Sequence, residues 1–192
     1  MNEEAFREFA EKNYVPVVRK QTSKLLLEKI KQINPKQILE IGTAIGFSGI
    51  LMLENSTAVL TTLEKDPKMF EMAKQNFENA GLKSRVNLVL CDAFDFLKNT
   101  NQKFDFVFLD GPKGQYAKYL PYLLNLLSNG GLLFCDNVLF GGLVEDYSKI
   151  PEKKHRTIVN NLRTFLKMVQ ENENLDSELI RIEDGICLIK LK

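Results

Sequence analysis

QILEIGTAIGFSG, residues 37–49, joins a short apolar segment to a turn that contains two glycines. Its first five residues have the length and composition of a buried strand, and residues 47–53 have the composition of a helix. Gly42 and Gly46 allow a tight turn and a close approach of the backbone to a ligand. The third glycine, which a dinucleotide-binding loop places near the pyrophosphate, is missing. The stretch therefore predicts a strand, a binding loop and a helix in succession.

Strands and helices are predicted to alternate along the rest of the chain. Further strands are expected at residues 58–64, 86–92, 104–110, 132–136, 178–182 and 185–191. Further helices are expected at residues 19–33, 67–81, 93–98, 114–127 and 155–171. Asp66 and Pro67 suit the N-cap and first position of one helix, and Asn129-Gly130-Gly131 is expected to end another. This alternation predicts the α/β class: a doubly wound, Rossmann-like seven-stranded sheet, mostly parallel, with a C-terminal antiparallel β-hairpin and helices on both faces.

Length and charge indicate one domain, 1–192, in which residues 1–33 form a helical cover. The 192 residues, 44% of them hydrophobic, suffice for one core. A formal net charge of +1 argues against a polyanion-binding surface that extends over the whole chain. No apolar run is long enough to span a bilayer, and the N-terminus lacks the apolar core of a signal peptide. We therefore expect a cytoplasmic protein without a membrane partner.

Cysteine and histidine usage argues against two other kinds of chemistry. Cys91, Cys135 and Cys187 each lie in an apolar stretch and are expected to be buried, reduced thiols. There is no CxxC motif, and His155 is the only histidine. A zinc site and a Ser–His or Cys–His hydrolase are therefore not expected.

An acidic residue lies at or next to the carboxyl end of each of the first five expected strands. These residues are Glu40, Glu64, Asp92, Asp110 and Asp136. In doubly wound sheets ligands bind where the strands end. A single acid at such a place often solvates a loop or caps a helix. Five of them at the same edge instead predict a shared binding site.

Several motifs carry a resemblance to a known family. They read LEIGTAIGFSG (39–49), LEKDP (63–67), CDAFDFL (91–97), FVFLDGPKGQY (106–116) and GGLLFCDNVLFGG (130–142). Together they resemble the metal-dependent O-methyltransferases that use S-adenosylmethionine, a family that includes catechol and caffeoyl-CoA O-methyltransferases. The resemblance extends from about Tyr14 to Lys192. Within the family, DGPKGQY, DNVLFGGLV and KHRTIV look most like bacterial tRNA 5-hydroxyuridine methyltransferases.

The resemblance implies a set of cofactor-binding residues. Ser48 and the Gly42 loop would hold the methionine end of S-adenosylmethionine, and the backbone near Val18 would close over it. Glu64 would accept hydrogen bonds from the ribose hydroxyls, as an acid about twenty residues after such a loop does in related folds. The adenine would lie beside Asp92 and Ala93. Glu40 and Asp110 complete the predicted cofactor-binding set.

The resemblance also implies a metal site and a catalytic base. Asp110, Asp136 and Asn137 would be the metal ligands, and Lys113 lies where catechol enzymes of the family have their catalytic lysine. Two carboxylates and one amide oxygen suit a hard cation, Mg²⁺ or Mn²⁺. A hydroxyl next to such a cation loses its proton more easily, and Lys113 could accept that proton, with Asp110 beside it. Ordinary capping at strand–helix junctions is the alternative interpretation of these residues.

The sequence leaves the methyl acceptor open between two classes. One is tRNA carrying 5-hydroxyuridine, whose 5-hydroxyl and O4 carbonyl form a vicinal oxygen pair like that of a catechol. Its phosphates could meet basic residues, unless these are only solvated charges: Arg19, Lys20, Lys24, Lys149, Lys153, Lys154, His155 and Arg156. The other is a small catechol-like or phenylpropanoid molecule. A noncatalytic binding module is a third interpretation, but the joint presence of Asp110, Lys113, Asp136 and Asn137 argues against it. The resemblance further implies a homodimer.

Overall fold

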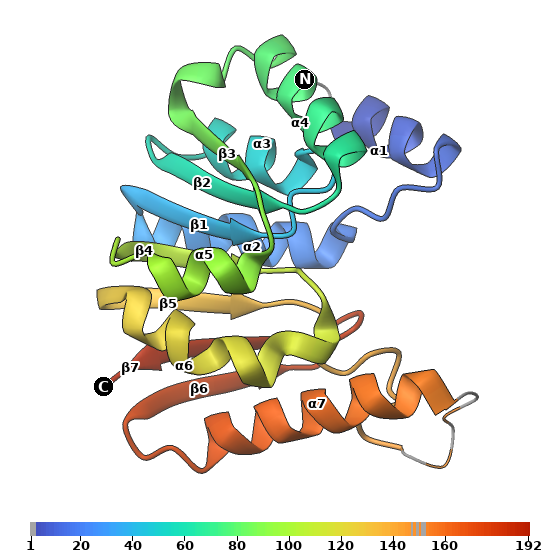
Figure 1. Ribbon diagram of the computed structural model, residues 1–192, viewed down its shortest axis with the longest axis vertical. Helices are drawn as coiled ribbons and strands as arrows, with labels where there is room; N and C mark the ends of the chain where they lie inside the picture. Colours follow the sequence, from blue (N-terminus) through green and yellow to red (C-terminus); the bar gives the residue numbers. More distant parts are fainter. Residues whose placement is uncertain (1–2, 147, 149, 151–152) are drawn as a thin grey trace.

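The computed structural model describes residues 3–146, 148, 150 and 153–192, without the side chains of residues 153 and 154. Seven strands form one sheet in the order β3-β2-β1-β4-β5-β7-β6 (Figure 1). They are β1 (Gln37–Ile41), β2 (Val59–Glu64), β3 (Val86–Leu90), β4 (Phe104–Leu109), β5 (Leu127–Cys135), β6 (Leu175–Ile180) and β7 (Ile186–Leu191). The first five pair in parallel, whereas β7 runs antiparallel to both of its neighbours. The predicted fold class is confirmed.

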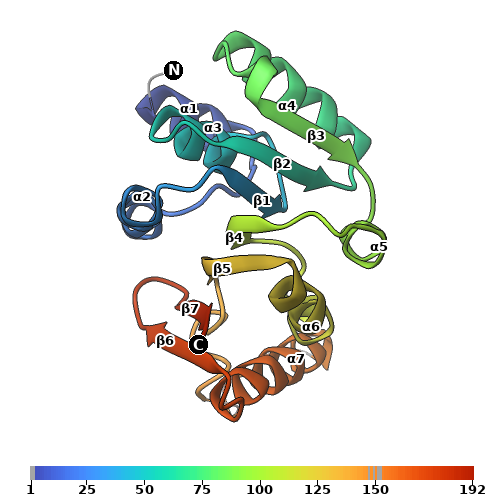
Figure 2. The ribbon, with the colours of Figure 1, turned by 90° about the vertical axis from the view of Figure 1, so that its left-hand side faces the viewer.

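Helices cover both faces of this sheet. They are α1 (Glu3–Lys12), α2 (Lys20–Ile33), α3 (Phe47–Glu54), α4 (Pro67–Asn79), α5 (Ala93–Asn99), α6 (Tyr116–Leu126) and α7 (Lys153–Gln170), with short 3-10 turns η1 (Lys83–Arg85) and η2 (Lys113–Gln115). Figure 2 shows α1, α2 and α3 on one side of the strands and α5, α6 and α7 on the other. Each face has its own apolar core, one shared with α1–α4 and the other with α5–α7. The central strands β1 and β4 are therefore buried on both sides, as their continuous apolar sequences require.

The helix starts follow the expected local chemistry. The Asp66 side chain accepts hydrogen bonds from the backbone N–H groups of Lys68 (2.8 Å) and Met69 (3.2 Å), and Pro67 is the first residue of α4. Asp92 caps α5 in the same way through Phe94 N–H at 2.8 Å. These caps satisfy backbone donors that a helix leaves unpaired at its first turn.

The predicted start of β5 was wrong, because the strand begins at Leu127 and not at Leu132. The strand includes Asn129-Gly130-Gly131, which the sequence pattern predicts as the end of the preceding helix. Leu127 already pairs with Phe104, and the register shifts before the pair Phe106–Leu132. Gly130 has φ of +76°, a conformation that glycine adopts easily. The irregular pairing between β4 and β5 therefore contains the glycines that sequence analysis assigned to a turn.

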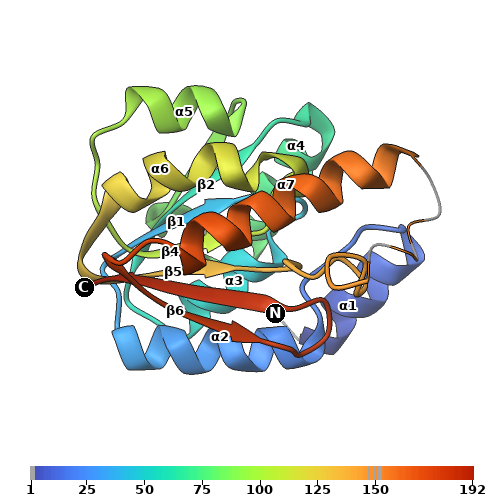
Figure 3. The ribbon, with the colours of Figure 1, turned by 90° about the horizontal axis from the view of Figure 1, so that it is seen from below.

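The start of α2 and the segment that precedes it lie near the carboxyl ends of the strands. After α1, residues 15–19 run extended and lead into α2 (Figure 1). The turn between β6 and β7 lies beside the start of α2, as Figure 3 shows from below. The two ends of the sequence thus meet at the edge of the sheet where ligands are expected.

Candidate active site

The loop after β1 requires glycine at position 42. Gly42 has φ of +100°, and a Cβ there would lie 2.5 Å from the backbone oxygen of Asp110. The loop therefore approaches the end of β4 more closely than any side chain would permit. This contact brings the first loop of the sheet directly against the candidate metal residues.

Glu64 is held in place by backbone donors. Its Oε2 accepts a 2.8 Å hydrogen bond from Ala44 N–H, and Oε1 accepts bonds of 2.9 Å from both Lys65 and Asp66. Ala44 itself has a positive φ of +47°, which turns its N–H toward this carboxylate. Glu64 thus fixes the glycine loop, and the carboxylate oxygens retain acceptor capacity for a ligand.

Glu40 lies on the other side of the same loop, fully buried. Ser48 donates a 2.5 Å hydrogen bond to its Oε1, and Thr62 donates one of 2.6 Å to its Oε2. Because the Thr62 proton is committed to Glu40, Thr43 donates to Thr62 at 2.6 Å. Burial raises the pKa of Glu40 to about 7, although the two hydroxyl donors lower it. Glu40 therefore supports Ser48 and Thr62 through these bonds, and its predicted contact with the cofactor stays a prediction.

Two cavities meet at Gly42 and Glu64. One, of about 380 Å³, is bounded by the carboxyl ends of β2 and β3 and by η2 and α6. Asp92, Ala93 and Phe94 form one wall of it, and Tyr119 lies opposite. The other, of about 450 Å³, lies between the extended residues 16–19 and the ends of β4 and β5. Both cavities thus lie at the carboxyl edge of the sheet and share Gly42 and Glu64 as lining residues.

The second cavity contains the predicted metal and catalytic residues. It is lined by Val18, Gly42, Glu64, Asp110, Lys113, Asp136 and Asn137, together with Pro16, Val17, Arg19, Ala44 and Asp184. Of the predicted site residues, Glu40 and Ser48 line neither cavity. None of the described residues that line this second cavity is aromatic.

Asp110, Lys113 and Asp136 form a charged group at the base of the cavity. Lys113 Nζ lies 2.6 Å from Asp110 Oδ1, and both side chains are largely buried. Asp136 is 2% exposed, and its Oδ1 accepts a 2.7 Å hydrogen bond from Asn137 N–H. Asn137 has φ of +57°, which only a few residue types adopt readily, asparagine among them.

The electrostatics of Asp136 suit a bound cation. Burial raises its pKa to about 7, and the nearby charge of Asp110 adds to the effect, while the Asn137 backbone and Lys113 lower it. Two carboxylates and one amide thus line the same cavity, with the Lys113 ammonium beside Asp110. A hard dication would offset the repulsion between the carboxylates and accept all three oxygens. The described residues contain no group of three or more His, Cys, Asp or Glu side chains that could hold a metal, so the set depends on Asn137.

Sequence analysis missed three residues around this cavity. The buried hydroxyl of Tyr116 lies 3.0 Å from the backbone oxygen of Leu109 and 3.1 Å from that of Asp136, and so ties β4 to β5. Asp184 lies 2.9 Å from Arg19, and Glu183 binds the start of α2. The pairing of distant residues explains why no local sequence pattern indicated Glu183 and Asp184.

The other predicted residues have mixed outcomes. Cys135 and Cys187 are buried, but Cys91 is partly exposed and lines the first cavity. The ring centroids of His155 and Phe140 lie 5.7 Å apart, and His155 Nδ1 is buried without a hydrogen-bond partner, so this nitrogen is not exposed to a phosphate.

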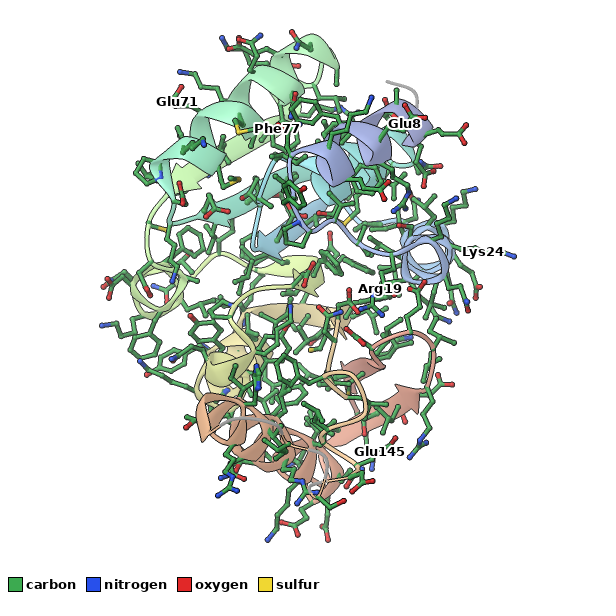
Figure 4. All side chains as sticks on the ribbon, turned by 90° about the vertical axis from the view of Figure 1, so that its right-hand side faces the viewer. Glu8, Arg19, Lys24, Glu71, Phe77 and Glu145 are labelled. Carbon is green, nitrogen blue, oxygen red and sulfur yellow. The ribbon has the colours of Figure 1, made fainter. Side chains whose placement is uncertain are left out.

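The basic residues proposed for tRNA are only partly described. Arg19 has a 55% exposed side chain and lies between α2 and the β6–β7 hairpin, whereas Lys24 points away from the protein (Figure 4). Lys20 and Arg156 are also exposed. Lys149 and the side chains of Lys153 and Lys154 lie outside the described residues.

Comparisons with known proteins define the family. The profile of the family described as O-methyltransferase matches residues 2–192. A catechol O-methyltransferase of Niastella koreensis is 33% identical, over 82% of this chain and 74% of that protein. A caffeoyl-CoA O-methyltransferase of Populus kitakamiensis is 30% identical, over 84% and 72%. The crystal structure of the SAH-bound methyltransferase PaMTH1 of Podospora anserina is 29% identical, with a TM-score of 0.83 over 92% of this chain and 80% of that one.

The fold, the acidic cleft and these comparisons together define the class of protein. The chain belongs to the O-methyltransferase family, and it is an enzyme that transfers methyl groups to oxygen. In the part of the chain that the structure describes, no helix is long and apolar enough to cross a membrane.

Proposed function

We propose that this enzyme transfers the methyl group of S-adenosylmethionine to one oxygen of a vicinal oxygen pair on a small catechol-like acceptor, with a divalent cation bound in the second cavity. The observation that carries the proposal is the convergence of Asp110, Lys113, Asp136 and Asn137 in the cavity that also contains Gly42 and Glu64. The names of the catechol and caffeoyl-CoA relatives favour a small acceptor.

The cofactor would occupy both cavities. Its ribose would bind Glu64, where they meet, with adenine between Ala93 and Tyr119 in the smaller one. Its methionine end would lie against the Gly42 loop, beneath Val18. A positive sulfonium there would be stabilised by the surrounding carboxylates. Placing the methyl group in line with the acceptor oxygen is then a matter of fixed geometry.

Asp110, Asp136 and Asn137 would hold Mg²⁺ or Mn²⁺. When bound, the cation would supply positive charge that lowers the pKa of an acceptor hydroxyl. As an ammonium bonded to Asp110, Lys113 has no free lone pair, so it would first release a proton to solvent and would then receive the hydroxyl proton as a neutral amine next to Asp110. Asp110 would thereby stabilise the protonated lysine that results.

A second candidate is 5-hydroxyuridine in the anticodon loop of a tRNA. The absence of aromatic side chains among the described lining residues of the second cavity favours it, since a free aromatic acceptor lacks a ring to stack on. Arg19 lines this cavity, and the exposed Lys20 and Lys24 follow it on α2, so these basic residues would meet phosphates. For either acceptor, we also propose that the enzyme is cytoplasmic and forms a homodimer.

One assay tests both candidates. Purified protein, methyl-labelled S-adenosylmethionine and Mg²⁺ are incubated with simple catechols, or with tRNA containing 5-hydroxyuridine. Labelled catechol supports the main proposal, and labelled tRNA alone favours the second. Lack of transfer to either acceptor by protein that binds S-adenosylhomocysteine would contradict both.

A further inference from the structure

The turn between β6 and β7 is bonded to the start of α2. Glu183 Oε2 accepts hydrogen bonds from Thr22 N–H (2.9 Å) and the Thr22 hydroxyl (2.7 Å), and Oε1 accepts one from Gln21 N–H (3.1 Å). Arg19, the N-cap residue of α2, makes no side-chain cap of its own. Glu183 therefore caps α2 from a position about 160 residues away in the sequence.

The same turn also holds the loop that follows the metal residues. Val138 N–H donates to the backbone oxygen of Gly185 at 3.0 Å, and Leu139 N–H donates to that of Asp184 at 2.8 Å. A Cβ on Gly185 would lie 2.3 Å from Leu139 Cγ, so the two segments are in close contact. The turn is thus fixed to the chain next to Asn137 and provides a rigid base on that side.

The cover segment, residues 15–19, is anchored by contacts from α1 and from the turn between β6 and β7. On the α1 side, Arg7 donates a 2.7 Å hydrogen bond to the backbone oxygen of Val18 and one of 2.8 Å to the Ser23 hydroxyl. On the α2 side, the anchors are the Glu183 cap and the pair between Arg19 and Asp184. Val18 is buried and lines the cavity opposite Gly42.

We infer that Glu183 is a positioning residue that holds the cover segment over the cofactor cavity by capping α2. This rests on the proposed function, which places S-adenosylmethionine beneath Val18. Burial of the Glu183 carboxylate opposes its charge, but bonds from Thr22 and Gln21 and the charge of Arg19 outweigh this and lower its pKa. The carboxylate therefore stays ionised and acts through α2, without touching the methyl group.

Loss of the cap should weaken cofactor binding more than turnover. If the cover segment is docked for a smaller fraction of the time, the apparent dissociation constant rises in proportion. For Glu183→Ala we expect a rise of about 3- to 30-fold for S-adenosylhomocysteine, the range that corresponds to losing a helix cap. The kcat at saturating S-adenosylmethionine should stay within about twofold, because the backbone bonds to Val138 and Leu139 remain. Glu183→Gln, which keeps an acceptor oxygen, should restore part of the affinity.

Asp105→Ala is the matched control. The Asp105 carboxylate also accepts two backbone hydrogen bonds, from Lys36 N–H (2.8 Å) and Gln37 N–H (3.0 Å), but at the amino end of β1, away from both cavities. Asp105→Ala should lower the unfolding temperature as Glu183→Ala does, yet leave the dissociation constant for S-adenosylhomocysteine unchanged. Equal loss of affinity in the two variants would reduce Glu183 to a general stabilising residue and overturn the inference.

Hydrogen exchange on the ligand-free protein separates this inference from the proposed function. Glu183→Ala should speed amide exchange over residues 18–23, while Asp105→Ala should speed it at residues 36–37 only. Unchanged exchange at residues 18–23 would overturn the inference, and so would faster exchange with unchanged calorimetric affinity for S-adenosylhomocysteine. If the wild type binds no S-adenosylhomocysteine while the exchange pattern holds, the proposed function fails and the cofactor part of the inference fails with it.

Discussion

Lys113 and Asp110 form a largely buried ion pair, in which Nζ lies 2.6 Å from Oδ1, at the base of the cavity next to Asp136. Among the four predicted metal and catalytic residues (Asp110, Lys113, Asp136 and Asn137), Lys113 is the only lysine or arginine. Its position three residues after Asp110, on the turn η2, keeps it within reach of both the carboxylates and an acceptor. The relationship makes Lys113 the first residue to test.

Lys113→Met is expected to lower kcat by a factor of about 10²–10⁴, the usual contribution of a positioned acid–base group. The KM for S-adenosylmethionine should change little, because the proposed function gives Lys113 no contact with the cofactor. Lys113→Arg keeps the charge but does not give up its proton near neutral pH. Steady-state kinetics with near wild-type kcat in Lys113→Arg would show that the charge, and not proton transfer, is what matters.

Asn137→Ala and Asp136→Ala should each abolish turnover while cofactor binding survives. These residues line the second cavity, whereas the adenine would lie beside Asp92 and Ala93 in the first one. Isothermal calorimetry with S-adenosylhomocysteine measures the second part. Loss of binding in a folded Asn137→Ala protein would contradict this separation of roles.

Removal of divalent cations with EDTA should abolish activity, and added Mg²⁺ or Mn²⁺ should restore it. The repulsion between Asp110 and Asp136 in a buried site is the physical reason to expect a bound cation. The change in thermal unfolding temperature on adding metal provides a readout independent of turnover. Full activity in exhaustively chelated protein would rule out the metal-assisted mechanism.

Glu64→Ala should weaken cofactor binding by about 1–3 kcal/mol, the value of charge-assisted hydrogen bonds to a ribose. The variant also removes the acceptor of Ala44 N–H, so part of the loss will come from the glycine loop. Glu64→Gln keeps one acceptor oxygen and should lose less affinity. An unchanged dissociation constant in both variants would mean that Glu64 serves the loop alone.

Glu40→Gln should change how stability depends on pH. The folded protein holds the Glu40 proton up to about pH 7, whereas the unfolded chain loses it near 4.5. Between these values the folded state binds more protons, so the free energy of unfolding falls as pH rises, by about 3 kcal/mol in total at roughly 1.4 kcal/mol per unit. Glu40→Gln should lose this slope and be the more stable protein at pH 8. Urea unfolding at pH 5 and pH 8 measures it, and parallel curves for the two proteins would disprove the assignment.

The sequence predicted the order of the elements because apolar periodicity and local turn chemistry are properties of neighbouring residues. Asp66-Pro67 and the Gly42 loop gave one helix start and the binding turn for this reason. The position of Asp110 and Asp136 also followed from local information, since each comes directly after a strand, and parallel strands end at one edge.

Only the tertiary structure distinguishes Glu40 from the four other acidic residues at the strand ends. Glu40 is the penultimate residue of β1, whereas Glu64 ends β2 and the three aspartates follow their strands. Side chains alternate between the two faces of a strand, so a shift of one residue along the strand decides whether a side chain points toward the cleft or into the core. Glu40 therefore lies buried against Ser48 and Thr62, where its charge is disfavoured. The pairing of Glu183 with α2 was likewise decided by the fold, because it depends on the twist and order of seven strands that bring residues 22 and 183 together, and no local pattern encodes that distance.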